Sequence, residues 1–364
     1  MKKISVIGVG KLGLCFSLKL EKCGYDIVGV DVHPGHVDQI NSKTLKSDEP
    51  HVEDLLRESS NFRATTDISA SLENDLIFVL VATPSLADGT YDHSQIDRVA
   101  NELINLGTQD RVKHLVICCT TMPGYCDHLA DRMTSYNYTV SYNPEFIAQG
   151  TIVQDQLKPD VILIGEHDIE SGNLVQAVYE DMCQGSPRYS RMTRKEAEIT
   201  KIALNCFLTT KIAYANMVGD AAYNAGCSPD AILTTIGADS RIGSKYLKWG
   251  FGFGGPCFPR DNRAFGIFSE MMGVYPHISY ATDQSNADHV SHYSKTLAIE
   301  EKGTIIFESV SYKPGTTIIE ESHQLKTALY LVNQGYRVVI RETPRVIEQV
   351  KNLHGYKFVY EERN

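Results

Sequence analysis

Short apolar runs alternate with amphipathic stretches over the first 190 residues or so. These runs are rich in Val and Ile, and they lie at Ile4–Ile7, Ile27–Val30, Leu76–Val81, His114–Cys118, Val140–Tyr142 and Val161–Ile164. Buried strands that alternate with helices are the pattern of a doubly wound parallel sheet. We therefore predict an α/β domain of the Rossmann type over residues 1–190.

The pattern changes to a long helical repeat after this domain. From Lys195 to about Ala225 there is no Pro and no Gly until Gly219, and apolar residues recur at helical spacing. This spacing predicts one long helix within a central helical domain over residues 191–300. The segment Trp249–Pro259 is rich in Gly, Pro and aromatic residues, a composition that favours a ligand-binding loop over a strand.

A second βαβ pattern follows Gly303. Strands are expected at Thr304–Val310, Arg337–Ile340 and Lys357–Tyr360, with a helix from about Ser322 to Gln334 after the first of them. Residues 301–364 are therefore predicted to form a smaller, shortened Rossmann-like domain. The predicted fold class is α/β throughout, with the long helix between the two sheets.

The charge, apolar content and cysteine spacing of the chain argue against several classes of binding partner. The net charge is −10 and there is no block of Lys and Arg, so a nucleic-acid partner is not expected. No apolar run approaches the ~20 residues that span a bilayer, so no membrane association is expected. The nine cysteines lack CxxC pairs and His partners at zinc spacing. They predict free thiols in the cytoplasm and no metal site.

A glycine motif lies directly after the first predicted strand. Gly8, Gly10 and Gly13 form a GxGxxG with Lys11 and Leu12 between the last two glycines, and Asp31 ends the next strand. In that context the glycines let a pyrophosphate approach a helix N-terminus, and Asp31 can accept hydrogen bonds from a ribose. A tight turn without a ligand is the alternative. The nearby residue His36 is not an arginine that could hold a 2′-phosphate. Together with Asp31, this favours NAD over NADP.

Cys257 lies in the segment Gly254-Gly255-Pro256-Cys257-Phe258-Pro259-Arg260-Asp261. A thiol among small residues is accessible, and a nearby arginine favours the thiolate nucleophile. Lys201 and Asn205 lie four residues apart, on one face of the predicted long helix. Together they can polarise an oxygen during alcohol oxidation. The alternatives are a structural cysteine and a solvated helix face.

These residues resemble the UDP-glucose/GDP-mannose dehydrogenase family over nearly the whole chain. Besides the glycine motif, the long helix and the cysteine segment, the matching motifs are Ala82-Thr83-Pro84-Ser85, Thr120-Thr121-Met122-Pro123, Asn143-Pro144-Glu145-Phe146, Arg241-Ile242-Gly243, Phe251-Gly252-Phe253-Gly254-Gly255 and Tyr312-Lys313-Pro314-Gly315-Thr316. The resemblance implies an NAD-dependent, four-electron oxidation of a nucleotide sugar, with UDP-glucose the favoured substrate.

The resemblance also implies roles for individual residues. Cys257 would attack the C6 aldehyde and carry a thioester. Lys201, Asn205 and Asp261 would surround the reacting oxygens, and Thr121 and Glu145 would position or activate the hydrolytic water. The residues implied in NAD binding are Thr83, Pro84, Thr121 and Arg260, in addition to the glycine motif, Asp31 and His36.

Further residues are implied in substrate binding. They are Glu145, Gln149, Lys201, Asn205, Arg241, Lys248, Phe251, Gly252, Gly254 and Lys313. Among them, Arg241 would reach the diphosphate of a substrate bound to a neighbouring subunit. The resemblance therefore implies a homodimer built on the long helix.

Three features depart from the family pattern. Gln149 replaces an acid, and its neutral amide cannot act as a base. Glu320 replaces an arginine that helps to hold NAD, and its carboxylate would repel a pyrophosphate. Only about sixty residues follow Gly303, which is a short C-terminal domain for the family.

Two other functions share this fold. A two-electron dehydrogenase of the 3-hydroxyacid or 6-phosphogluconate type has the same N-terminal domain and a Lys and Asn pair, but it has no use for Cys257. A catalytically weak protein that binds NAD or a nucleotide sugar would explain the three departures. It would not explain why Lys201, Asn205, Cys257 and Asp261 occur together.

Overall fold

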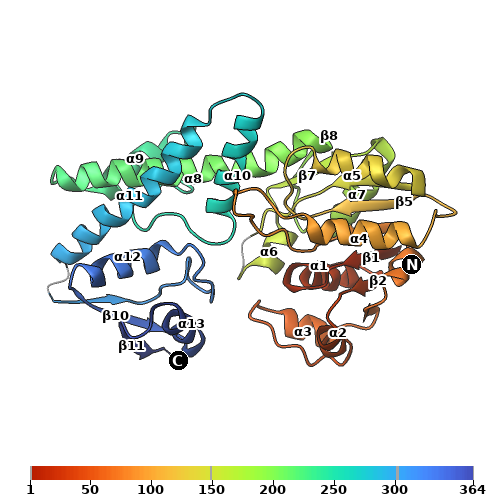
Figure 1. The fold of residues 1–364 in the computed structure, drawn as a ribbon, viewed down its shortest axis with the longest axis horizontal. Coiled ribbons are helices and arrows are strands. Elements are labelled where there is room, and N and C mark those ends of the chain that lie inside the picture. Colours follow the sequence, from red (N-terminus) through yellow and green to blue (C-terminus); the bar gives the residue numbers. More distant parts are fainter. Residues whose placement is uncertain (1, 148–149, 301–302, 364) are drawn as a thin grey trace. The chain divides into compact units, whose positions relative to one another are not determined.

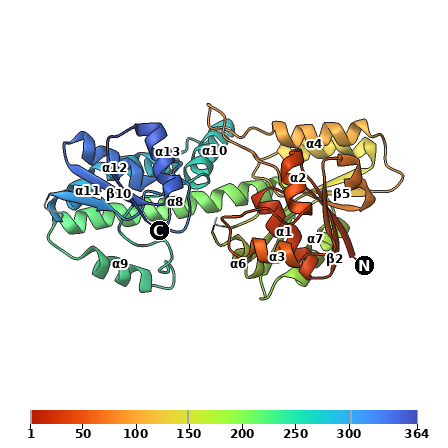
Figure 2. The ribbon, with the colours of Figure 1, turned by 90° about the horizontal axis from the view of Figure 1, so that it is seen from below.

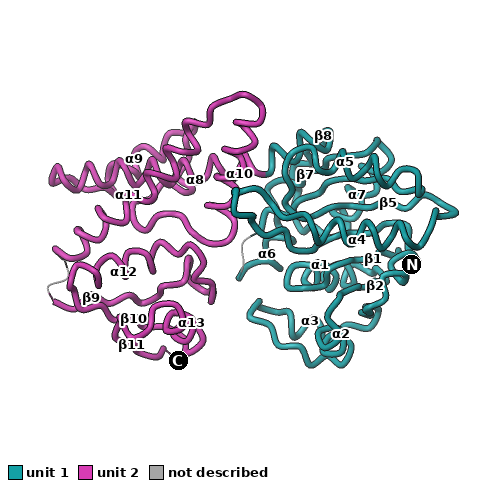
Figure 3. Tube along the Cα trace, viewed as in Figure 1, with its two compact units in different colours: residues 1–201 teal, residues 202–364 magenta. Residues whose placement is uncertain are grey.

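The computed structural model describes residues 2–147, 150–300 and 303–363. The chain divides into two compact units, residues 1–201 and residues 202–364 (Figure 3). The finer division at residues 190 and 300 stays a prediction.

Unit 1 is built on one eight-stranded sheet with the order β3-β2-β1-β4-β5-β6-β7-β8 (Figure 1). The strands are β1 (Lys2–Ile7), β2 (Tyr25–Val30), β3 (Phe62–Thr65), β4 (Leu76–Val79), β5 (Lys113–Ile117), β6 (Tyr138–Tyr142), β7 (Val161–Glu166) and β8 (Arg188–Thr193). The order of the first six strands is that of a Rossmann fold, so this prediction is confirmed.

The final two strands of this sheet differ from the expected all-parallel arrangement. β7 pairs with β6 in the antiparallel direction, and β8 is parallel to β7. β3 and β8 were not among the predicted strands. Both lie at the edges of the sheet, where a strand has one neighbour and buries less apolar surface.

Helices cover both faces of the sheet. One face carries α1 (Lys11–Lys22), α2 (Pro34–Asn41), α3 (Val52–Glu58), α6 (Ile152–Leu157) and α7 (Ile169–Met182). The other carries α4 (Ser94–Asn105) and α5 (Tyr125–Met133), and the short 3-10 turns are η1 (Ile68–Glu73) and η2 (Thr134–Tyr136).

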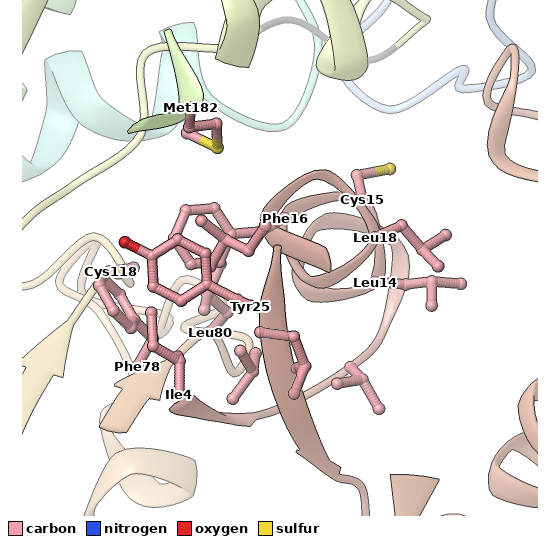
Figure 4. Packing of buried hydrophobic residues seen from close by; sticks show 14 of the residues in the cluster. Ile4, Leu14, Cys15, Phe16, Leu18, Tyr25, Phe78, Leu80, Cys118 and Met182 are labelled. Atoms are coloured by element: carbon pink, nitrogen blue, oxygen red, sulfur yellow. The ribbon is translucent and has the colours of Figure 1, made fainter. Parts of the chain in front are cut away.

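The hydrophobic core beside α1 holds the turn between β1 and α1 in place. In Figure 4, Phe16 of α1 lies close to Phe78 of β4, with ring centroids 5.0 Å apart. Both rings are fully buried, and burial of such a side chain contributes about 1.5–3 kcal/mol. This packing holds the N-terminus of α1 against the carboxyl ends of β1 and β4.

Unit 2 contains the second sheet and a group of helices. The long helix α8 (Arg194–Asn224) begins at the end of unit 1 and continues into unit 2, which confirms the predicted helix. The other helices are α9 (Pro229–Ala238), α10 (Phe258–Met271), α11 (His277–Glu300), α12 (His323–Asn333) and α13 (Pro344–His354). Figure 2 shows α9 lying beside α8, and Leu233 of α9 packs against Ala215 of α8.

The C-terminal sheet has the order β11-β10-β9 and is parallel, as predicted. Its strands are β9 (Thr304–Phe307), β10 (Arg337–Glu342) and β11 (Val359–Glu362). The predicted loop Trp249–Pro259 is shorter than expected, because α10 begins at Phe258.

Among the described residues, no helix is long and apolar enough to cross a membrane. Nor do three His, Cys, Asp or Glu side chains come together as a metal site within residues 2–147, 150–300 and 303–363.

Candidate active site

The glycine motif forms the turn between β1 and α1. Gly8 has a φ of +91°, and a Cβ there would lie 2.6 Å from the carbonyl oxygen of Leu80. A Cβ on Gly13 would lie 2.0 Å from the carbonyl oxygen of Gly8. Around Gly10, in contrast, no described atom lies within 4 Å of the position of a Cβ. The outer glycines therefore close the turn, and the middle one borders open space at the N-terminus of α1, which suits a pyrophosphate.

The other residues predicted around this turn have structural contacts as well. Nε2 of His36 lies 2.8 Å from the carbonyl oxygen of Val9, so this ring supports the backbone of the turn. Asp31 follows β2 directly, and its Oδ1 accepts a hydrogen bond from the backbone N–H of His33 at 3.1 Å. Leu12 packs against the core, while Nζ of Lys11 lies 3.8 Å from the buried carboxylate of Glu49.

Thr83 and Thr121 are both buried. The Thr83 hydroxyl donates to the carbonyl oxygen of Thr120 at 2.8 Å, and Thr121 donates to Oε1 of Glu198 at 2.8 Å. Glu198 also accepts hydrogen bonds from the backbone N–H groups of Gly124 and Cys126, so it caps the N-terminus of α5. Glu198 was not among the residues predicted from the sequence, although it is an acid one turn before Lys201 on the same helix.

Pro84 is exposed in the segment after β4. The catalytic and NAD-binding roles implied for Thr121 stay predictions.

Glu145 and Lys201 come together in unit 1. The ammonium of Lys201 donates to the backbone carbonyl oxygen of Glu145 at 2.7 Å and lies 4.5 Å from the ring centroid of Phe146. Burial raises the pKa of the Glu145 carboxyl to about 7, and the Tyr179 hydroxyl and Lys201 counteract this rise. A carboxyl with that pKa can both give and accept a proton near neutral pH.

A small cavity beside Glu145 has room for about one water molecule. Its polar lining includes Asn143, Gln156 and Tyr179. The Tyr179 hydroxyl lies 2.7 Å from Oδ1 of Asn143 and 3.2 Å from Oε1 of Glu145, and neither contact was predicted from the sequence. The predicted substrate residue Gln149 lies outside the described residues.

Cys257 is the N-cap residue of α10 in unit 2, and it is exposed. The positive end of the helix dipole favours a thiolate at this position. Other cysteines are less reactive, because burial raises the pKa of the Cys15 and Cys119 thiols to about 12 and that of Cys183 to about 11. All nine cysteines are thiols rather than disulfides, as predicted.

Asn205 and Asp261 are also brought together. Nδ2 of Asn205 donates to Oδ2 of Asp261 at 2.6 Å, and Nε of Arg260 lies 3.3 Å from Oδ1 of the same carboxylate. Asp261 is fully buried one helical turn after Cys257, and its backbone N–H donates to the Cys257 carbonyl oxygen at 2.8 Å. The cysteine, the carboxylate and the amide therefore form one connected group in unit 2.

The predicted substrate loop, residues 248–254, is packed tightly against its own unit. A Cβ on Gly252 would lie 2.1 Å from Oδ1 of Asn286, and one on Gly254 would lie 2.4 Å from the carbonyl oxygen of Glu321. The ring of Phe251 packs against the core of the C-terminal sheet, with its centroid 6.1 Å from that of Phe307. Lys248, at the start of the loop, is exposed.

Three further predicted residues lie at the surface of unit 2. Arg241 is highly exposed and binds its neighbour Asp239, with Nη2 2.7 Å from Oδ2. Lys313 is partly exposed in the segment between β9 and α12, and Glu320 is exposed in the same segment. The neighbouring Glu321 binds Arg263 at 2.8 Å. No contact here tests the ligand roles of Arg241, Lys313 and Glu320.

Fold and site together define an NAD-dependent dehydrogenase class: a Rossmann sheet with an open glycine turn, joined by a long helix to a unit that carries a thiol at a helix N-terminus. Residues 2–183 match the NAD binding domain of the UDP-glucose/GDP-mannose dehydrogenase family, and residues 195–288 match the central domain of that family. The chain belongs to this family.

Individual relatives agree with this assignment. UDP-glucose 6-dehydrogenase of Pseudomonas aeruginosa is 29% identical over 92% of this chain and 78% of its own length. GDP-mannose 6-dehydrogenase of Pseudomonas putida is 27% identical over 97% of this chain and 83% of its own length. Among solved structures, a UDP-glucose dehydrogenase from Pyrobaculum islandicum has a TM-score of 0.88 and 28% identity, covering 100% of this chain and 86% of that one.

Proposed function

We propose that this protein oxidises the C6 alcohol of a nucleotide sugar to a carboxylate with two molecules of NAD, and that UDP-glucose is its substrate. The observation that supports this proposal most strongly is the placement of Cys257. It is an exposed thiol at the N-terminus of α10, and the buried carboxylate of Asp261 and amide of Asn205 belong to the same connected group. A two-electron dehydrogenase does not need such a nucleophile.

The residues divide the chemistry between them. NAD, when bound at the glycine turn, supplies the hydride acceptor for both oxidations. Lys201 and Asn205 stabilise the alkoxide as the alcohol loses its proton and first hydride. The Cys257 thiolate adds to the aldehyde carbon, and loss of the second hydride leaves a thioester on the cysteine. Water then cleaves the thioester with Glu145 as base, which regenerates the thiol.

The proposed reaction is balanced in atoms and electrons. One alcohol, two NAD and one water give one carboxylate, two NADH and three protons. Asp261 and Arg260 hold Asn205 and the start of α10 in place throughout. With Gln149 neutral, hydrolysis depends on Glu145, whose pKa of about 7 suits a base near neutral pH.

We also propose that the protein is located in the cytoplasm and forms a homodimer. The cytoplasm is reducing, which suits nine thiols. The dimer is supported by a row of apolar side chains on α8 that are exposed in the chain, namely Leu204, Phe207, Tyr214 and Met217. Arg241 would then reach the substrate of the partner.

Substrate choice and the role of the thiol can be tested together. Initial rates of NADH formation would be compared for UDP-glucose, GDP-mannose and UDP-N-acetylglucosamine, and we expect UDP-glucose to have the highest kcat/KM. In the Cys257→Ser variant, formation of the carboxylate should fall by about a thousandfold or more. Full carboxylate production by Cys257→Ser would favour the two-electron dehydrogenase, and no NADH from any sugar would favour a binding protein.

A further inference from the structure

A buried histidine of α11 holds the loop of residues 248–254. Nδ1 of His289 lies 2.7 Å from Oδ2 of Asp220 on α8, and Nε2 lies 2.7 Å from the backbone carbonyl oxygen of Gly250. Both distances suit short hydrogen bonds in which one partner carries a charge. The side chain of His289 is 2% exposed and that of Asp220 is 15% exposed, so water competes little for these bonds.

The two partners define the protonation state of the ring. A backbone carbonyl oxygen only accepts hydrogen bonds, so Nε2 must carry a proton. The Asp220 carboxylate also accepts, through its other oxygen, from the indole N–H of Trp249 at 2.9 Å. An ionised carboxylate in that position requires a proton on Nδ1 as well. A neutral imidazole has one N–H and could satisfy only one of the two acceptors.

We propose that His289 is a buried imidazolium which, paired with Asp220, positions the loop 248–254 to receive the nucleotide sugar. This inference rests on the proposed function for the identity of the ligand. Asp220 and His289 act through the loop and are therefore positioning residues.

The loop is fixed by a set of backbone contacts around this pair. The N–H of Gly250 donates to Oδ1 of Asn216 at 3.1 Å, and the N–H of Phe253 donates to Oδ1 of Asn286 at 2.9 Å. Trp249 stacks on Tyr223 with a centroid distance of 5.5 Å. The histidine bond to Gly250 lies between these contacts, so its loss would release the middle of the loop while both ends remain attached.

Neighbouring groups explain why one histidine carries the charge. His323 of α12 lies with its ring centroid 5.4 Å from that of His289. Burial, and then the charge of His289, lower the pKa of His323 to about 3, so His323 is neutral. Asp220 of α8 is the negative group that faces the pair, and Lys326 of α12 is a further positive group nearby. The carboxylate therefore balances one imidazolium.

Trp249 is the only tryptophan among the 364 residues of the chain, so its fluorescence reports on this loop. Loss of the His289 side chain removes the hydrogen bond to Gly250 and should change the surroundings of the Trp249 indole. At one pH near neutrality, we expect the Trp249 emission maxima of His289→Gln and of Asp220→Asn to differ from that of the wild type. The emission of His292→Gln, which changes an exposed histidine of the same helix, should match that of the wild type.

Kinetics provide the second arm of the test. His289→Gln and Asp220→Asn should raise KM for the nucleotide sugar by about tenfold or more, while KM for NAD stays within about twofold of the wild type. His292→Gln should change neither constant. A general loss of folding would instead change both KM values and the circular dichroism spectrum.

Each outcome decides the proposal. A Trp249 emission in folded His289→Gln that matches the wild type would overturn it, as would an unchanged sugar KM in a folded variant whose Trp249 emission has changed. If one of the two variants does not fold, the other provides the same comparison of Trp249 emission and of the sugar KM. If no sugar yields NADH, the proposed function fails, whereas the fluorescence comparison still tests whether His289 holds the loop.

Discussion

Glu145 connects the chemistry of unit 1 with its stability at the scale of a single residue. Its carboxyl has a pKa of about 7 in the folded protein, above the ordinary value of 4.5, because of burial. A raised carboxyl pKa means that the protonated form is favoured by folding. Its contribution to stability is therefore complete below about pH 4.5 and is lost as the pH rises through about 7.

The Glu145→Gln variant tests this linkage, since a neutral amide does not titrate. Between about pH 5 and about pH 8, the free energy of unfolding of the wild type should fall by about 2–3 kcal/mol relative to that of the variant. Urea unfolding at both pH values measures the difference. If the free energy of unfolding depends on pH in the same way in both proteins, the Glu145 carboxyl is ionised over the whole range. That result would contradict its proposed role as a base with a pKa near neutral pH.

At the scale of the element, the turn between β1 and α1 offers a matched pair of variants. Gly13→Ala places a Cβ 2.0 Å from the carbonyl oxygen of Gly8, whereas Gly10→Ala places one in open space. Gly13→Ala should therefore lower the melting temperature, and Gly10→Ala should leave it unchanged but weaken NAD binding by about tenfold or more. Thermal unfolding and calorimetric titration with NAD separate the two effects. Unimpaired NAD binding by Gly10→Ala would contradict the placement of the pyrophosphate.

Helices and strands with a regular pattern of apolar residues were predictable from the sequence, whereas the two strands at the edges of the large sheet were not. The strand Ile4–Ile7 and the helix from Lys195 bury regular apolar positions, and both are present in the structure. β3 and β8 have few apolar residues, because a strand at the edge of a sheet buries less of its surface. The reversed direction of β7 is invisible in composition, since a buried strand has the same pattern in either direction.

The candidate site was predictable where a motif carries the chemistry, as at Gly8–Gly13 and at Cys257. It was not predictable where distant residues meet. His289 and Asp220 lie 69 positions apart in the sequence, and Thr121 and Glu198 lie 77 apart. Such pairs are brought together by packing, and no local pattern of one partner indicates the other.

At the scale of the whole molecule, α8 carries the surface on which the dimer is proposed. Phe207 is 69% exposed and Met217 is 54% exposed, although both are large and apolar. Phe207→Glu would place a charge in a buried interface, and we expect it to convert a dimer to a monomer at micromolar concentration. Light scattering coupled to gel filtration measures the mass. Ile169→Glu, an exposed apolar position of unit 1, is the control, and a wild-type protein that is monomeric would contradict the proposal.

The four-electron reaction is the central claim for the molecule, and the yield of NADH tests it most directly. With NAD in excess over a limiting amount of UDP-glucose, the absorbance of NADH at completion gives the number formed per sugar. The mechanism through Cys257 predicts two NADH and one UDP-glucuronate per UDP-glucose. One NADH per sugar, with the aldehyde as the released product, would contradict it.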